Sequence, residues 1–262
     1  MPTLAMRVMR MVDDPKVSGR DLERVISLDP VIMGEILKLA NSALYSPKFP
    51  ITALRHAISY LGLEVVKNLV MMVSLKSMVL GEEDPEVEGF LKELWIHSAA
   101  SAIISSFIAD SSPALDKEEA FVCGLFHDVG KLLMLKFSSE AYLPIVGRVR
   151  KGEGGFLELE EGELGLNHGM AGAVVMEAWE MPGHLINLVK QHHARVEHPM
   201  IACITLANLF CATWGYSVTP LEIEIVGFPW AMEVLSFHAE QWEELSSKAK
   251  KQIEEAAEIL GI

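Results

Sequence analysis

The segment Gly124–Lys131, with the sequence GLFHDVGK, places an imidazole, a carboxylate and an ammonium in an otherwise apolar region. A buried polar group costs free energy unless it is paired or binds something, so these three groups need a reason to be there. Imidazole and carboxylate ligands suit a divalent metal, and the ammonium of Lys131 could meet an anion held beside them. On this evidence alone, a histidine paired with its neighbouring aspartate in a helical core is an equally good interpretation.

The element expected to position these groups is a helix. Apolar residues recur at helical spacing from Glu118 to Lys136, which predicts a single helix through the segment. On that helix His127 and Asp128 lie about 100° apart around the axis, so both can reach one point beside it. Lys131 lies one turn beyond His127 on the same face, and Gly124 and Gly130 flank the pair of His127 and Asp128.

Composition favours a chain without membrane spans or disulfides. Half of the 262 residues are apolar, yet no uninterrupted apolar run reaches the ~18 residues that cross a bilayer. The first residues lack the basic start and the long apolar stretch of a secretory signal. Cys123, Cys203 and Cys211 show no CxxC spacing, and we interpret them as small core residues in a reducing compartment. We therefore expect a cytoplasmic protein that is not inserted in a membrane.

Charge is divided unevenly along the chain. Residues 1–80 contain ten Lys and Arg and seven Asp and Glu, a balance of +3. Residues 81–262 contain twelve and twenty-nine, a balance of −17, which completes the net charge of −14. Such an acidic surface repels phosphate backbones, which argues against nucleic-acid binding. The change of charge near Gly81–Pro85 predicts one domain, 1–262, made of two helical lobes, 1–85 and 86–262, that share an apolar interface.

Hydrophobic periodicity and helix-end signals predict helices throughout, so the expected fold class is all-α. In the first lobe the expected helices are 21–28, 31–41, 51–61 and 63–80, with Asp29 capping one of them and Gly62 ending another. In the second lobe they are 89–108, 118–136, 138–150, 156–164, 168–180, 185–191, 200–214 and 239–260. Leu221–Ile225 alone alternates in the manner of a strand. The acidic groups Glu82–Asp84 and Glu160–Glu161 are expected on solvated faces.

Further polar residues accompany His127 and Asp128 at helix positions or helix edges in apolar surroundings: His97, His168, His192, His193 and Asn208. In this order, residues 90–214 resemble the HD superfamily of metal-dependent phosphohydrolases. The resemblance implies that His97, His127 and Asp128 bind one metal ion and that Asp128 bridges to a second. It implies that His168, His192 and His193 complete the second site, and that Lys131 contacts substrate phosphate. The last ligand of the superfamily is a carboxylate, and this sequence has Asn208 in its place, which offers only a neutral amide oxygen.

The first lobe carries a more specific pattern. Residues Ile26–Pro30, Leu37–Tyr45, Ile51–Ile58 and Leu61–Gly62 resemble the HDOD family, and together with the HD-like half this resemblance covers nearly the whole chain. HDOD proteins are bacterial, are usually associated with signalling, and in many cases have lost the catalytic residues. The pair Ala207–Asn208 also fits HDOD proteins better than the hydrolases. The Gly-Tyr-Pro element of the HD-GYP cyclic-dinucleotide phosphodiesterases is absent after His193, so that activity is not implied.

Two hypotheses from different classes follow. In the first, the chain is a regulatory module that acts through a protein partner in a bacterial signalling pathway, and its HD-like site is vestigial or structural. In the second, it is a metal-dependent phosphohydrolase, a phosphodiesterase or nucleotide phosphatase, in which Asp128 and Lys131 act on a phosphate-containing ligand. Asn208 favours the first hypothesis, and the nearly complete histidine series favours the second. We expect the regulatory module, with one or two divalent ions (iron, manganese or zinc) in the site.

Overall fold

The computed structural model describes residues 3–12, 14–42, 45–79, 84–217, 219 and 227–260. Within these ranges the chain forms helices and no strand, which confirms the all-α class. Leu221–Ile225, where the sequence suggested strand alternation, lies outside the described ranges. The described chain divides into two compact units, one of residues 3–78 with 251–260 and one of residues 79–250. The expectation of a single domain with lobes 1–85 and 86–262 stays a prediction.

The first unit is built from five helices around an aliphatic core. They are α1 (Thr3–Val12), α2 (Gly19–Ile26), α3 (Pro30–Ala40), α4 (Leu54–Leu61) and α5 (Leu63–Val79). Buried residues of all five helices, among them Leu22, Ile36 and Val70, form the core. No single helix in the described ranges is long and apolar enough to span a membrane. The pair α4 and α5 passes that test by length and composition but is bent by 115°.

The helix ends in this unit follow from local side-chain chemistry. The carboxylate of Asp29 accepts the backbone N–H groups of Val31 and Ile32, which caps α3 as predicted. Gly62 separates α4 from α5 with φ of +87°, a conformation that residues with a Cβ rarely adopt. The side chain of Asn41 donates to the carbonyl of Ile51 at 2.7 Å and accepts its N–H at 2.7 Å. These bonds connect the end of α3 to the segment that begins at Ile51.

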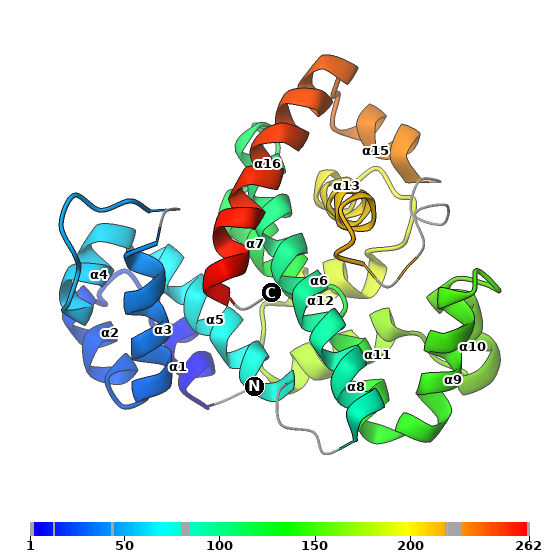
Figure 1. Ribbon diagram of the computed structural model, residues 1–262, viewed down its shortest axis with the longest axis horizontal. Coiled ribbons are helices and arrows are strands. Elements are labelled where there is room, and N and C mark those ends of the chain that lie inside the picture. Colours follow the sequence, from blue (N-terminus) through cyan, green and yellow to red (C-terminus); the bar gives the residue numbers. More distant parts are fainter. Residues whose placement is uncertain are drawn as a thin grey trace. The chain divides into compact units, whose positions relative to one another are not determined.

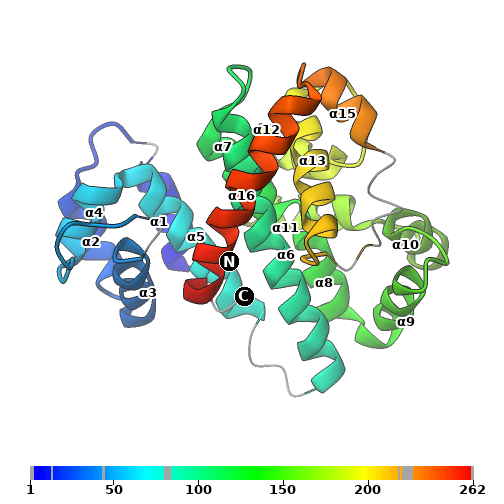
Figure 2. The same ribbon diagram turned by 45° about the horizontal axis from the view of Figure 1, so that its top comes forward.

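The second unit holds the predicted site. It contains α6 (Pro85–Asp110), α7 (Lys117–Phe126), α8 (Val129–Phe137), α9 (Ser139–Arg150), α10 (Phe156–Leu164), α11 (His168–Ala178), α12 (Gly183–Gln191), α13 (Pro199–Thr213), α15 (Phe228–Val234) and residues 239–250 of α16 (Ala239–Leu260). Helix α6 packs against α7 and α13, and α11 packs against both α8 and α12. Helices α9 and α10 lie side by side (Figures 1 and 2). The sequence pattern gave no indication of α15, which packs on α13.

The predicted helix 118–136 is wrong as a single element, because the chain breaks at His127 and Asp128. Helix α7 ends at Phe126 and α8 begins at Val129. Asp128 has φ of −100° and ψ of 8°, which places it in the bridge region outside the regular α-helix. The break frees His127 and Asp128 from the fixed helical spacing of about 100°, and both side chains face the same cluster.

Two glycines allow helix backbones to approach where a side chain would not fit. A Cβ on Gly130 of α8 would lie 1.8 Å from the carbonyl oxygen of His168 in α11. A Cβ on Gly124 of α7 would lie 2.6 Å from the carbonyl oxygen of Ser101 in α6. Contacts this short are not tolerated between non-bonded atoms, so glycine at both positions sets the separation between the helices that carry the site.

We predict that Gly130→Ala lowers the free energy of unfolding by about 3 kcal/mol or more, because the added methyl group forces α8 away from α11. Gly147→Ala in α9 is the control, because a Cβ there meets no atom within 4 Å. It should be neutral or raise stability by ~0.5–1 kcal/mol through helix propensity. Urea unfolding followed by circular dichroism measures both changes. Equal stability of the two variants would contradict the close contact.

Candidate metal centre

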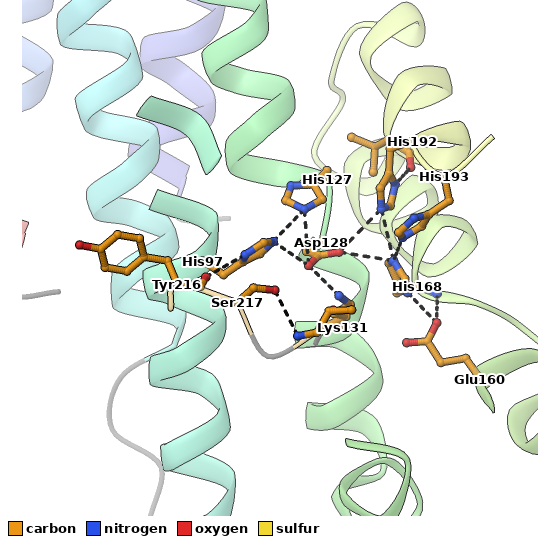
Figure 3. A network of polar contacts seen from close by, with 12 residues as sticks. His97, His127, Asp128, Lys131, Glu160, His168, His192, His193, Tyr216 and Ser217 are labelled. Atoms are coloured by element: carbon orange, nitrogen blue, oxygen red, sulfur yellow. Dashed lines mark hydrogen bonds and ion pairs between the residues drawn. The ribbon is translucent and has the colours of Figure 1, made fainter. Parts of the chain in front are cut away.

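The structure brings six of the predicted ligands together, five imidazoles around the carboxylate of Asp128. They come from the interior of α6 (His97), the break between α7 and α8 (His127, Asp128), the start of α11 (His168) and the end of α12 (His192, His193). Figure 3 shows Asp128 in the middle of the imidazoles. All six residues are buried except His193, which is exposed.

One group of ligand atoms surrounds Oδ2 of Asp128, and we call it the His97 position. The Nε2 atoms of His97 and His127 lie 3.4 and 3.5 Å from this oxygen and 3.1 Å from each other. The ammonium of Lys131 also donates to it at 2.7 Å. Three potential ligand atoms thus converge here, and one of them already accepts a hydrogen bond.

The other group surrounds Oδ1 of Asp128, and we call it the His168 position. The Nε2 atoms of His168 and His192 lie 3.3 and 3.7 Å from Oδ1. The Nε2 atom of His193 lies 2.9 Å from that of His168. Asp128 therefore contributes one oxygen to each position, as expected of a carboxylate that bridges two ions.

Hydrogen bonds on the far side of the rings fix which nitrogen carries a proton. The Nδ1 atoms of His97, His127 and His192 lie 3.0, 2.8 and 2.6 Å from the backbone carbonyls of Tyr216, Gly124 and Val189. A carbonyl can only accept, so in each neutral ring the proton is on Nδ1 and Nε2 presents a lone pair. The Nε2 atoms that face Asp128 are therefore available as metal ligands.

The charge states of His97, His127 and Asp128 also suit metal binding. Burial lowers the pKa of His97 to about 3, in opposition to the attraction of Asp128. Burial likewise lowers the pKa of His127, so both rings are neutral at neutral pH. Burial acts to raise the pKa of Asp128, but Lys131 and the imidazoles hold it well below its usual range. His97 and His127 are thus neutral imidazoles beside an ionised carboxylate.

This donor set fits a cation at each position. Lone pairs of His97 and His127 face each other at 3.1 Å, and those of His168 and His192 at 3.3 Å, which is repulsive unless a positive ion lies between them. Oδ1 of Asp128 is buried and receives no hydrogen bond from the described residues. Imidazole nitrogens with a shared carboxylate are ligands that suit zinc, iron and manganese.

The expectation that Glu160 lies on a solvated face is wrong. Its side chain is fully buried and accepts hydrogen bonds from the Tyr142 hydroxyl at 2.6 Å and from the backbone N–H of His168 at 2.8 Å. Its Oε2 atom also lies 2.6 Å from Nδ1 of His168. Helical spacing could have identified it, because Glu160 follows the buried Phe156 by four residues on α10. Its neighbour Glu161 is exposed, as predicted.

A pocket adjoins the cluster and contains the two remaining predicted residues. It has a volume of about 450 Å³ and is lined by residues that include Lys131, His192, His193, Arg195 and Asn208. Asn208 on α13 is buried, and its Oδ1 atom has no hydrogen-bond partner among the described residues. Lys131 is buried too, with Nζ 4.1 Å from the centre of the Phe156 ring. Both side chains can therefore meet a ligand that enters the pocket.

Comparison with known proteins identifies relatives over most of the chain. A family model described as HDOD domain matches residues 1–195. An uncharacterized protein of Treponema pallidum (strain Nichols) is 23% identical over 218 residues, which are 80% of this chain and 41% of that protein. The chain thus spans less than half the length of this relative.

Solved structures share the fold. An HDOD domain protein of unknown function from Geobacter sulfurreducens has a TM-score of 0.80 at 22% identity, over 99% of this chain and 92% of that chain. A protein from Shewanella amazonensis SB2B, whose name suggests a phosphohydrolase, has a TM-score of 0.75 at 21% identity, over 99% of this chain and 94% of that chain. At these identities the likeness extends to the fold alone.

The low pKa of His97 predicts how stability depends on pH in the presence of a chelator. The unfolded imidazole has a pKa of about 6.5, whereas the folded one has a pKa of about 3. Between these values only the unfolded chain binds the proton, so the stability is present above pH 6.5 and is lost as the pH falls. The slope for one such group is about 1.4 kcal/mol per pH unit.

Urea unfolding between pH 7.5 and 5 measures this slope for the unmodified protein and for His97→Gln, which should show a shallower dependence. His184→Asn is the control, because His184 is exposed and lies outside the cluster. A slope that is the same in all three proteins would show that His97 is not held neutral by burial.

Proposed function

Because this chain belongs to the HDOD domain family, we propose that it is a signalling protein that acts through a protein partner and carries a metal centre of low catalytic capacity. The observation that carries the proposal is that five histidines surround Asp128 while the adjoining pocket contains the neutral Asn208. The proposal includes a protein partner and a cytoplasmic location.

The residues that would hold the ions follow from the two positions. His97 and His127 with Oδ2 of Asp128 would hold one ion, and His168, His192 and His193 with Oδ1 would hold the other. Imidazole and carboxylate favour iron, manganese or zinc over calcium and magnesium, which prefer oxygen ligands. When bound, such ions neutralise charge on a phosphate ester and activate water toward it.

Asn208 is the reason to expect little turnover. A carboxylate at this position would add a full negative charge beside the ions and could take a proton from water. The amide has a similar shape but carries no charge and has no basic oxygen. Its Oδ1 atom is buried without a partner among the described residues, so it is free to contact an ion or its water as a weaker ligand.

The second candidate function is a metal-dependent phosphohydrolase, and the pocket favours it. Lys131 and Arg195 place two positive side chains in its lining, next to His192 and His193. A phosphate-containing ligand in the pocket would meet these charges at the edge of the metal centre. In this function Lys131 stabilises negative charge on the phosphate oxygens, while Asp128 holds the ions.

One set of assays separates the two functions. We predict that the protein purified without chelator contains iron, manganese or zinc and hydrolyses a generic phosphodiester and several nucleotides slowly or not at all. Asn208→Asp should raise metal affinity and activity, because it adds the missing charge. Asp128→Ala should lose the metal, because both positions share this carboxylate.

Elemental analysis and hydrolysis are measured for all three proteins, with circular dichroism to show that each is folded. Rapid metal-dependent hydrolysis by the unmodified protein would contradict the regulatory proposal and support the phosphohydrolase. Unchanged metal content in Asp128→Ala would show that the cluster is not the metal site.

A further inference from the structure

We propose that the two metal positions differ in affinity, and that the His168 position fills first because the buried pair Tyr142 and Glu160 supports it. The inference rests on the metal centre of the proposed function and adds a loading order to it. It also assigns a positioning role to two residues that lie outside the set of ligands.

Glu160 is placed to strengthen His168 as a ligand. One of its oxygens faces Nδ1 of His168 at 2.6 Å and also accepts the backbone N–H of that residue at 2.8 Å. The other accepts the hydroxyl of Tyr142 at 2.6 Å. An ionised carboxylate accounts for all three contacts, because it only accepts and the partners all donate. A ring that donates Nδ1–H to a carboxylate has a more basic Nε2 atom and a fixed orientation.

The histidines of the His97 position have weaker support. The Nδ1 atoms of His97 and His127 face the carbonyls of Tyr216 and Gly124, which carry partial charge only. The same is true of His192, whose partner is the carbonyl of Val189. Among the described residues, His168 is therefore the ligand with a full negative charge directly behind its ring.

Lys131 increases the difference in metal affinity between the two positions. Its ammonium donates at 2.7 Å to Oδ2 of Asp128, the oxygen that belongs to the His97 position. An ion bound there would share this oxygen with a positive charge, and the two cations would repel each other. Oδ1 has no such competitor, because no described residue donates to it. The His168 position also offers four ligand atoms, whereas the His97 position offers three.

Packing in the core fixes the side chain of Tyr142, which hydrogen-bonds to Glu160 behind His168. Tyr142 of α9 is fully buried, and its ring stacks on that of Phe156 with centroids 6.3 Å apart and an interplanar angle of 18°. The ring of Phe90 in α6 packs against the Tyr142 ring, with the two centroids 6.1 Å apart. The hydroxyl of Tyr142 is thus fixed toward Glu160, and α9 and α10 together position the first residue of α11.

The test is a titration of the metal-free protein with Co²⁺, followed by calorimetry and by the visible absorption of the bound ion. The unmodified protein should bind two ions in two steps. Glu160→Gln should weaken the tighter step about 10- to 100-fold, because it removes the charge and replaces one acceptor oxygen by a donor. Glu158→Gln removes the same charge from an exposed position of α10 and should leave both steps unchanged.

Two ligand variants identify which position is which. His168→Ala should abolish the tighter step, whereas His97→Ala should abolish the weaker step and leave the tighter one. Loss of the tighter step in His97→Ala, or an unchanged tighter step in Glu160→Gln, would overturn the loading order. If Glu160→Gln does not fold, Tyr142→Phe decides instead. A weakened tighter step then supports the proposal, and an unchanged one overturns it.

The failure of the proposed function has a different signature. If the unmodified protein binds no Co²⁺ in either step, the metal centre itself is wrong, and the loading order is wrong with it. If it binds two ions with equal affinity, the metal centre stands and the inequality of its positions is overturned.

Discussion

The chemistry of the site depends on hydrogen bonds from imidazoles to backbone carbonyls at helix ends. His127 follows the last residue of α7 and bonds to the carbonyl of Gly124, and His192 follows the last residue of α12 and bonds to that of Val189. Carbonyls in the last turn of a helix lack a partner within the helix, so each ring satisfies a group that would otherwise be unpaired. The same bond fixes the proton on Nδ1 and turns the lone pair of Nε2 toward Asp128. Two helix ends thus determine which nitrogen is protonated in His127 and His192.

The sequence predicted well those features that depend on local chemistry. The end of α4 at Gly62 and the cap of α3 by Asp29 follow from the residue types at those positions. The order of polar residues likewise identified the five imidazoles that gather around Asp128, and the lysine beside them. The family match over residues 1–195 confirms the resemblance that the first lobe suggested.

What the sequence could not show depends on tertiary contacts. The helix break at His127 and Asp128 interrupts an apolar pattern that is periodic on both sides, so the pattern does not indicate it. The close packing of α8 on α11 at Gly130 is likewise a tertiary contact. The burial of Glu160 could be inferred from its helical spacing to Phe156, but its partners Tyr142 and His168 lie on other helices and could not be inferred from that spacing. Local propensity contains no information about such partners.

The spacing of the ligands along the chain has a consequence for folding. His97 and His193 are far apart in sequence, and the cluster joins the interior of α6 to the ends of α7, α11 and α12. An ion held by such residues closes long loops, which removes conformational entropy from the partly unfolded chain in the way a disulfide does. In this sense the metal centre is a reversible cross-link. Its occupancy would decide whether these helices open one at a time or only together.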